Sequence, residues 1–265
     1  MFIKYKDLQK LFVSEINEEL SRFPVEAPGI ITEKDIEHLP EPVKKYFRYC
    51  GLIGKNKMMN AKIEWKDVYL KRGFNEKWMS MYCSQFNSVA EPTRIVFMKA
   101  KILRMIPFEG RDKCQHGHGN MLIKLLRMFT IADAKGKEMD ASALVTVLAE
   151  ALLVPGYALQ KYIKWTPIDI KSAKATLTWK ECEVSGIFFF NDKGEFERFE
   201  TTDRYYSTTG KDYKKIKWTA TVDIYHETNG IRCPAYFRAT WNTEKGDLDY
   251  FKGSLATIRY NIRNY

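Results

Sequence analysis

The sequence has few cysteines and lacks any long uncharged hydrophobic run. Its five cysteines are widely spaced and form no C-x-x-C pair, so neither a zinc ribbon nor a redox dithiol is indicated. No run of eighteen apolar residues predicts a membrane-spanning helix. The first twenty residues carry charges throughout, unlike the apolar region of a signal peptide. We therefore expect a soluble, cytoplasmic protein with free thiols.

Motifs for catalysis or nucleotide binding are also missing. None of the serines lies in a G-x-S-x-G context, so a nucleophile elbow is not predicted, and no motif calls for a cofactor. The formal net charge of +10 would suit nucleic acid, an anionic membrane or an acidic ligand. However, the cations are scattered and nowhere three in a row. We expect a solvated basic surface and no nucleic-acid partner.

The first part of the chain, residues 1–58, has helical patterns. Apolar residues recur with helical spacing between residues 8 and 20, which predicts an amphipathic helix. A second short helix is predicted after Leu39-Pro40, with Pro42 in its first turn and Gly51 at its end. We expect residues 1–58 to be a helical segment that packs on a sheet.

The second part, residues 59–265, is dominated by strand patterns. Ile63 and Trp65 alternate with charged residues, and the phase of this alternation slips at Val68, which indicates a bulge. The next two runs, residues 78–86 and 94–103, are apolar on both faces. Such strands must be covered on both sides. We expect the N-terminal helices to cover one side and a helix inserted later in the chain to cover the other.

Helices are predicted within residues 120–163. Asp140 suits the N-cap of a long helix, whose apolar face continues to Leu152 and ends before Pro155. A shorter helix over Met121–Phe129 is expected to precede it. From Ala173 onward, strands return and are joined by turns such as Asn229-Gly230. Consecutive hairpins without β-α-β alternation predict the α+β class, with a curved antiparallel sheet on which the helices pack.

The chain resembles a bacterial family of unknown function. The resemblance is carried by Gly119-Asn120-Met121, Ala132-Asp133-Ala134, Gly136, Glu138, Asp140, Leu148-Ala149-Glu150, Arg204-Tyr205, Asn229-Gly230, Gly246-Asp247 and Tyr260-Asn261, and it extends over roughly residues 39–261. It implies no reaction. The layout is similar to the open half-barrels of periplasmic lipoprotein carriers, which hold acyl chains between a curved sheet and internal helices. This similarity implies that the sheet here is an open half-barrel.

Two polar groups are candidates for an enzyme site. Cys114, His116 and His118 alternate, so on a strand they would share one face, as three zinc ligands can. Since Gly117 lies among them, polar residues at a strand end are the preferred interpretation. A second group, the carboxylates of Asp133, Glu138, Asp140 and Glu150, would suit acid–base catalysis. Turn formation and capping of the helix start are the preferred explanation of these carboxylates, and we assign no catalytic residue and no metal ligand.

The aromatic residues are the stronger candidates for a binding site. Most tryptophans fall at strand positions that face inward, and a curved sheet lined by such residues can hold an apolar ligand. Arg204 or Tyr205 would then fix the polar head of the ligand. The alternative is a close-packed core without a cavity. The predicted ligand-binding residues are Trp65, Trp78, Trp165, Arg204, Tyr205, Trp218 and Trp241.

The sequence therefore favours a binding module for an apolar or lipid-like small molecule over an enzyme. One alternative is a hydrolase-type enzyme that uses the acidic or the Cys/His group. Another is a scaffold that docks on an acidic partner or on an anionic membrane surface. The ligand and the oligomeric state are left open by the sequence.

Overall fold

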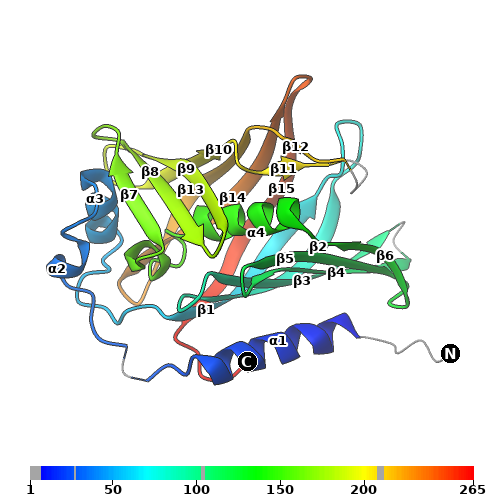
Figure 1. The fold of residues 1–265 in the computed structure, drawn as a ribbon, viewed down its shortest axis with the longest axis horizontal. Coiled ribbons are helices and arrows are strands. Elements are labelled where there is room, and N and C mark those ends of the chain that lie inside the picture. Colours follow the sequence, from blue (N-terminus) through cyan, green and yellow to red (C-terminus); the bar gives the residue numbers. More distant parts are fainter. Residues whose placement is uncertain (1–6, 27, 103–104, 208–211) are drawn as a thin grey trace.

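The computed structural model describes residues 7–26, 28–102, 105–207 and 212–265. It contains one open sheet of thirteen strands, in the order β6-β5-β4-β3-β2-β1-β15-β14-β13-β10-β9-β8-β7, with β11 and β12 paired separately (Figure 1). All pairs are antiparallel. The predicted class, a curved antiparallel sheet with a few helices packed on it, is confirmed.

The helices are α1 (Leu8–Arg22), α2 (Glu33–Ile36), α3 (Glu41–Tyr49), α4 (Lys137–Ala149) and the 3₁₀ turn η1 (Tyr157–Leu159). The strands of the first half are β1 (Asn60–Leu70), β2 (Met79–Ser88), β3 (Thr93–Ile102), β4 (Ile106–Gln115), β5 (His118–Leu125) and β6 (Phe129–Ala134). Those of the second half are β7 (Ile163–Pro167), β8 (Ser172–Trp179), β9 (Cys182–Phe190), β10 (Phe196–Thr201), β11 (Tyr205–Tyr206), β12 (Lys214–Lys215), β13 (Trp218–Thr228), β14 (Ile231–Thr243) and β15 (Gly246–Tyr260). None of the helices in this described part of the chain has the length and apolar content that a bilayer crossing requires.

Helix α4 lies between the two arms of the curved sheet (Figure 1). It contacts β4 and β5 near one end of the strand order and β8 and β9 near the other. Leu144, Val145 and Leu148 of this helix are at most 2% exposed and join the main core. The helix therefore bridges the open side of the sheet, as the inserted apolar helix was expected to do.

Helix α1 covers the opposite, outer face of the sheet. Its apolar residues Leu8, Phe12 and Ile16 pack against Phe86 of β2 and Phe97 of β3. In Figure 1 it runs beneath β3 and β4, on the side away from α4. The expected cover of the early strands by an N-terminal helix is thus present on the outer face, whereas the main contacts of α4 on the inner side are with β4 and β5 rather than with β2 and β3.

The segment before α4 differs from the prediction. The expected helix Met121–Phe129 is wrong, because these residues form β5, a turn and the start of β6. Helical structure in the insert is limited to α4 and η1. The predicted N-cap Asp140 is also wrong. The N-cap is Gly136, and the Asp140 carboxylate instead accepts a 2.7 Å hydrogen bond from the backbone N–H of Gly119.

Candidate ligand-binding face

One part of the inner face of the sheet is apolar and incompletely buried. Its centre is a buried cluster of Val68, Met81, Cys83 and Val96. Around this centre lie side chains that keep part of their surface exposed. We call the whole group the apolar inner face, and its partly exposed members are Trp65, Leu70, Met79, Met98, Ala100 and Phe251.

Strand alternation places these side chains on the inner side. Along β2, Met79, Met81 and Cys83 face inward, whereas Phe86 faces the outer cluster with α1. In β1, the pairing register with β2 shifts between Glu64 and Val68. This bulge corresponds to the slip in the sequence pattern, which is confirmed, and it lets both Trp65 and Val68 join the apolar inner face.

Three methionines give the apolar inner face an adaptable surface. Met79 and Met98 are partly exposed, and Met81 is 7% exposed. Methionine has three rotatable bonds and a polarizable sulfur, so it fits against apolar groups of varied shape. Beside them, the ring of Trp65 packs edge-on against Phe237 and Phe251, with centroids 5.2 and 6.0 Å away. The face therefore combines rigid aromatic rings with flexible thioethers.

A buried polar cluster borders this face where α4 ends. The Glu150 carboxylate accepts hydrogen bonds from Gln85 Nε2 at 2.7 Å, from Asn87 Nδ2 at 2.9 Å and from Arg94 Nε at 2.8 Å. Arg94 also pairs with Asp112 at 2.8 Å. These contacts fix the C-terminal end of α4 to β2 and β3. Trp65 is held to the same cluster through its Nε1, which donates to Gln85 Oε1 at 3.1 Å.

Three of the predicted binding residues come together beside α4. The Arg204 guanidinium lies over the rings of Trp218 and Trp241, 4.5 and 5.5 Å from their centroids. Its Nη1 donates to the α4 carbonyl of Ser142 at 3.3 Å and to the Thr146 hydroxyl. The Nε of Arg204 is buried and has no hydrogen-bond partner among the described residues.

Tyr205 joins this group through its backbone, whose N–H donates to the Ser142 hydroxyl at 3.1 Å. The group is continuous with the apolar inner face, because Trp241 follows Ala239 by two residues on β14 and Ala239 pairs with Phe251. Trp65, Arg204, Trp218 and Trp241 therefore border one region. The tryptophans do so because alternate residues of neighbouring strands face the same side, and Arg204 reaches them from the segment between β10 and β11.

The two remaining tryptophans lie elsewhere. Trp78 precedes β2, and its ring lies near two cations, Lys71 at 6.0 Å and Lys252 at 4.7 Å. Trp165 is on the edge strand β7, where its ring packs 5.0 Å from that of Phe188 and its Nε1 donates to the Ala158 carbonyl. The structure brings neither ring to the apolar inner face.

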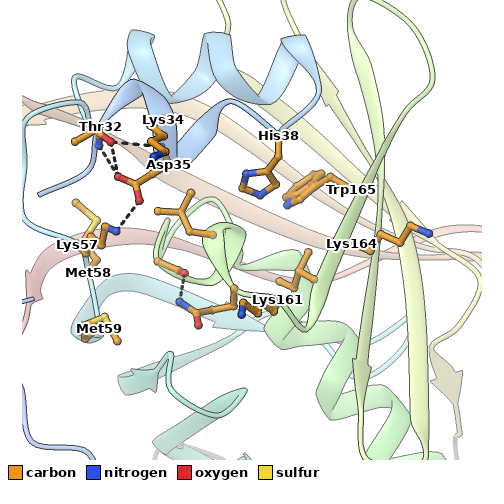
Figure 2. Close-up of a pocket in the computed structure, with 14 residues that line it drawn as sticks. Thr32, Lys34, Asp35, His38, Lys57, Met58, Met59, Lys161, Lys164 and Trp165 are labelled. Carbon is orange, nitrogen blue, oxygen red and sulfur yellow. Dashed lines mark hydrogen bonds and ion pairs between the residues drawn. The ribbon is translucent and has the colours of Figure 1, made fainter. Parts of the chain in front are cut away.

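Trp165 instead lines a separate cavity of about 740 Å³ beside α2 (Figure 2). Four lysines give this cavity a positive lining, Lys34, Lys57, Lys161 and Lys164, and Asp35 is the one acidic residue among the described residues that line it. Asp35 is paired with Lys57 at 2.6 Å. This hydrogen bond, with those from Thr32, lowers the pKa of Asp35 to about 2.

The two candidate enzyme sites are not assembled. The chain turns at His116, whose φ of 55° is left-handed, so Cys114, His116 and His118 do not share one strand face, and the preferred interpretation of polar residues at a strand end is confirmed. His116 contacts Arg22 and Glu91. Burial raises the pKa of the Cys114 thiol far above its usual range.

The carboxylates are separated and individually engaged. The salt bridge of Asp133 with Lys135 lies on the surface, whereas Glu150 belongs to the buried cluster. Within residues 7–26, 28–102, 105–207 and 212–265, no group of three or more His, Cys, Asp or Glu is arranged to hold a metal ion.

Several residues of the apolar inner face were missed by the sequence analysis, which singled out tryptophans. Met98, Ala100 and Phe251 belong to it as much as Trp65 does. The pattern that could have identified them is the inward alternation of Met79 and Met81 along β2, because residues paired with an inward-facing strand position face inward too.

Comparisons with known proteins give a family and a fold neighbour. Residues 29–253 match the model of a family of unknown function, DUF6544. No curated protein matches the chain. Among solved structures, the chain is similar to a LolA superfamily protein from Nitrosomonas europaea, NE2245, with 8% sequence identity and a TM-score of 0.45, over 82% of this chain and 93% of that one.

Proposed function

This chain belongs to the DUF6544 family, whose function is unknown, and from its geometry we propose that it is a binding module for an apolar or lipid-like small molecule. The ligand would lie against the apolar inner face. The observation that carries this proposal is the ring of partly exposed apolar side chains around Val68, Met81, Cys83 and Val96. Apolar surface on the concave side of a sheet is typical of ligand sites.

The polar end of the ligand would lie toward Arg204. The Nε of this side chain is a buried donor without a partner among the described residues, and a buried unpaired donor costs free energy. A carboxylate or phosphate oxygen of the ligand would satisfy it. The guanidinium of Arg204 lies over the rings of Trp218 and Trp241, which hold it in position. The aliphatic part of the ligand would then extend toward Trp65 and Phe251.

The test compares two tryptophan substitutions on neighbouring residues of β3. Ala100 is a partly exposed member of the apolar inner face, and Lys101 is its exposed neighbour in the strand, where side chains alternate between faces. Ala100→Trp fills the proposed site, and Lys101→Trp is the matched control. We expect Ala100→Trp to weaken the binding of N-phenyl-1-naphthylamine, measured by its fluorescence, by about tenfold, and the control to leave it unchanged.

Native mass spectrometry of gently purified wild-type protein gives a second measurement. A copurified apolar molecule that is lost in Ala100→Trp supports the proposal. Equal probe affinity in the wild type and in both variants, together with a ligand-free mass, would refute it. The cytoplasmic location stays a prediction of the sequence.

A further inference from the structure

Exposed apolar side chains gather at the ends of two adjacent hairpins. The β3–β4 and β5–β6 hairpins lie side by side, since Leu126 donates its backbone N–H to the Pro107 carbonyl at 2.8 Å. In Figure 1 they lie at the same end of the molecule, away from α2 and α3. We call their described apolar residues the hairpin tips, and each is between 45% and 79% exposed: Met105, Leu126, Met128, Phe129 and Ile131.

The β5–β6 turn keeps two bulky residues in a strained conformation. Leu126 and Arg127 both have positive φ, 53° and 62°. They are the central residues of the β-turn closed by the hydrogen bond from the Met128 N–H to the Leu125 carbonyl, 3.2 Å long. Such a turn strongly prefers Asn-Gly at these positions, because a side chain costs free energy in the left-handed region. Backbone strain at these two exposed residues does not help the chain to fold. It therefore points to a functional role for the leucine and arginine side chains.

The surroundings of the hairpin tips are positively charged. Residues 99–102, 105–109 and 124–131 include four cations and one carboxylate, Glu109. Lys99 and Lys101 are exposed, Arg127 is exposed but paired with Glu109 at 3.0 Å, and Lys124 is buried. The net formal charge of these three ranges is therefore +3, within a chain of net charge +10. Exposed apolar side chains beside cations are the combination that binds the interface of an anionic bilayer.

We propose that the hairpin tips dock on the surface of a membrane that contains anionic lipids. The apolar side chains enter the headgroup region, and the exposed cations Lys99 and Lys101 contact lipid phosphates. A second copy of this chain fits less well, since a two-fold contact would bring the same cations of both copies together. The hairpin tips also adjoin the inner side of the sheet, because Ala100 of the apolar inner face pairs with Phe108, which in turn pairs with Leu125 beside the β5–β6 turn. A lipid-like ligand could thus pass between bilayer and protein.

Cosedimentation with vesicles tests this docking without any bound ligand. The full chain is mixed with vesicles of phosphatidylcholine alone or of phosphatidylcholine with phosphatidylglycerol, at low and at high salt. We expect binding to the anionic vesicles, and a strong decrease at high salt as charges are screened. The double variant Met128→Ser/Phe129→Ser is expected to bind at least about tenfold more weakly, and Lys101→Glu several-fold more weakly.

The control removes apolar surface of similar exposure elsewhere. Ile168 and Ile170, 51% and 85% exposed, lie in the β7–β8 turn. The variant Ile168→Ser/Ile170→Ser should bind vesicles as the wild type does. The proposal is overturned if the wild type binds no anionic vesicles, if both double variants bind equally, or if the hairpin tips instead hold a dimer that Met128→Ser/Phe129→Ser dissociates. Probe binding to the apolar inner face should persist in every variant, which separates this test from that of the proposed function.

Discussion

Removal of the Glu150 carboxylate is the sharpest test of the packing beside the apolar inner face. This carboxylate is 13% exposed and its partner Arg94 is 15% exposed, so water screens the pair weakly. Glu150→Ala would remove one hydrogen-bond acceptor each from Gln85 and Asn87 and would break one of the two ion pairs of Arg94. The end of α4 would lose its polar attachment to β2 and β3.

The expected loss of stability follows from these contacts. Breaking a buried ion pair by removal of one partner costs about 3–5 kcal/mol. Because Asp112 still neutralises Arg94, we expect the lower end, about 3 kcal/mol in the free energy of unfolding. The assay is urea denaturation, and the control is Glu244→Ala, whose ion pair with Lys214 is exposed and should contribute little, because water screens it. If the two variants lose equal stability, the cluster is solvated and this reasoning is refuted.

Two further predictions concern a glycine and a surface carboxylate. A Cβ at Gly156 would lie 1.7 Å from the Met58 carbonyl oxygen. Gly156→Ala should therefore lower the free energy of unfolding, measured by urea denaturation, by about 3 kcal/mol. In the control Gly73→Ala, the new Cβ would lie 3.7 Å from its nearest neighbour, and stability should change little. Lys57 lowers the pKa of Asp35 from 3.8 to about 2, so its stabilisation is full above pH 3.8 and is lost as the pH falls toward 2. Asp35→Asn should therefore lose less stability than the wild type over that interval, measured by urea denaturation at several pH values. An identical loss of unfolding free energy between pH 3.8 and 2 in both proteins would contradict this.

Much of the fold follows from local patterns in the sequence. The predicted first helix corresponds to α1, and the turn at Asn229-Gly230 joins β13 and β14. The β5–β6 hairpin was missed for two physical reasons. Leu122 packs on the outer cluster, while Ile123 pairs with Gly110 and faces the inner side. Both faces of the strand are therefore apolar, and its sequence shows no alternation of apolar and polar residues. Its turn, Leu126-Arg127, lacks the glycine or asparagine that normally marks a hairpin.

The candidate site was predictable only in part. Tryptophans at alternate positions indicated an inner face, and the structure brings Trp218 and Trp241 together under Arg204. The contact of Arg204 with Thr146 of α4 joins residues 58 apart in the chain, which no local pattern encodes. The same holds for the acidic residue Glu150, whose partners come from strands more than fifty residues earlier.

The dimensions of α4 and the sheet explain why apolar surface is left uncovered. Helix α4 has 13 residues and is therefore about 20 Å long. Strand β15 has 15 residues, which corresponds to about 50 Å. One helix of that length cannot cover the whole inner side of such a sheet, and its main contacts are with β4, β5, β8, β9 and β11 rather than with the central strands. A sheet longer than its covering helix must leave inward-facing side chains for another apolar group, and the apolar inner face lies on these central strands.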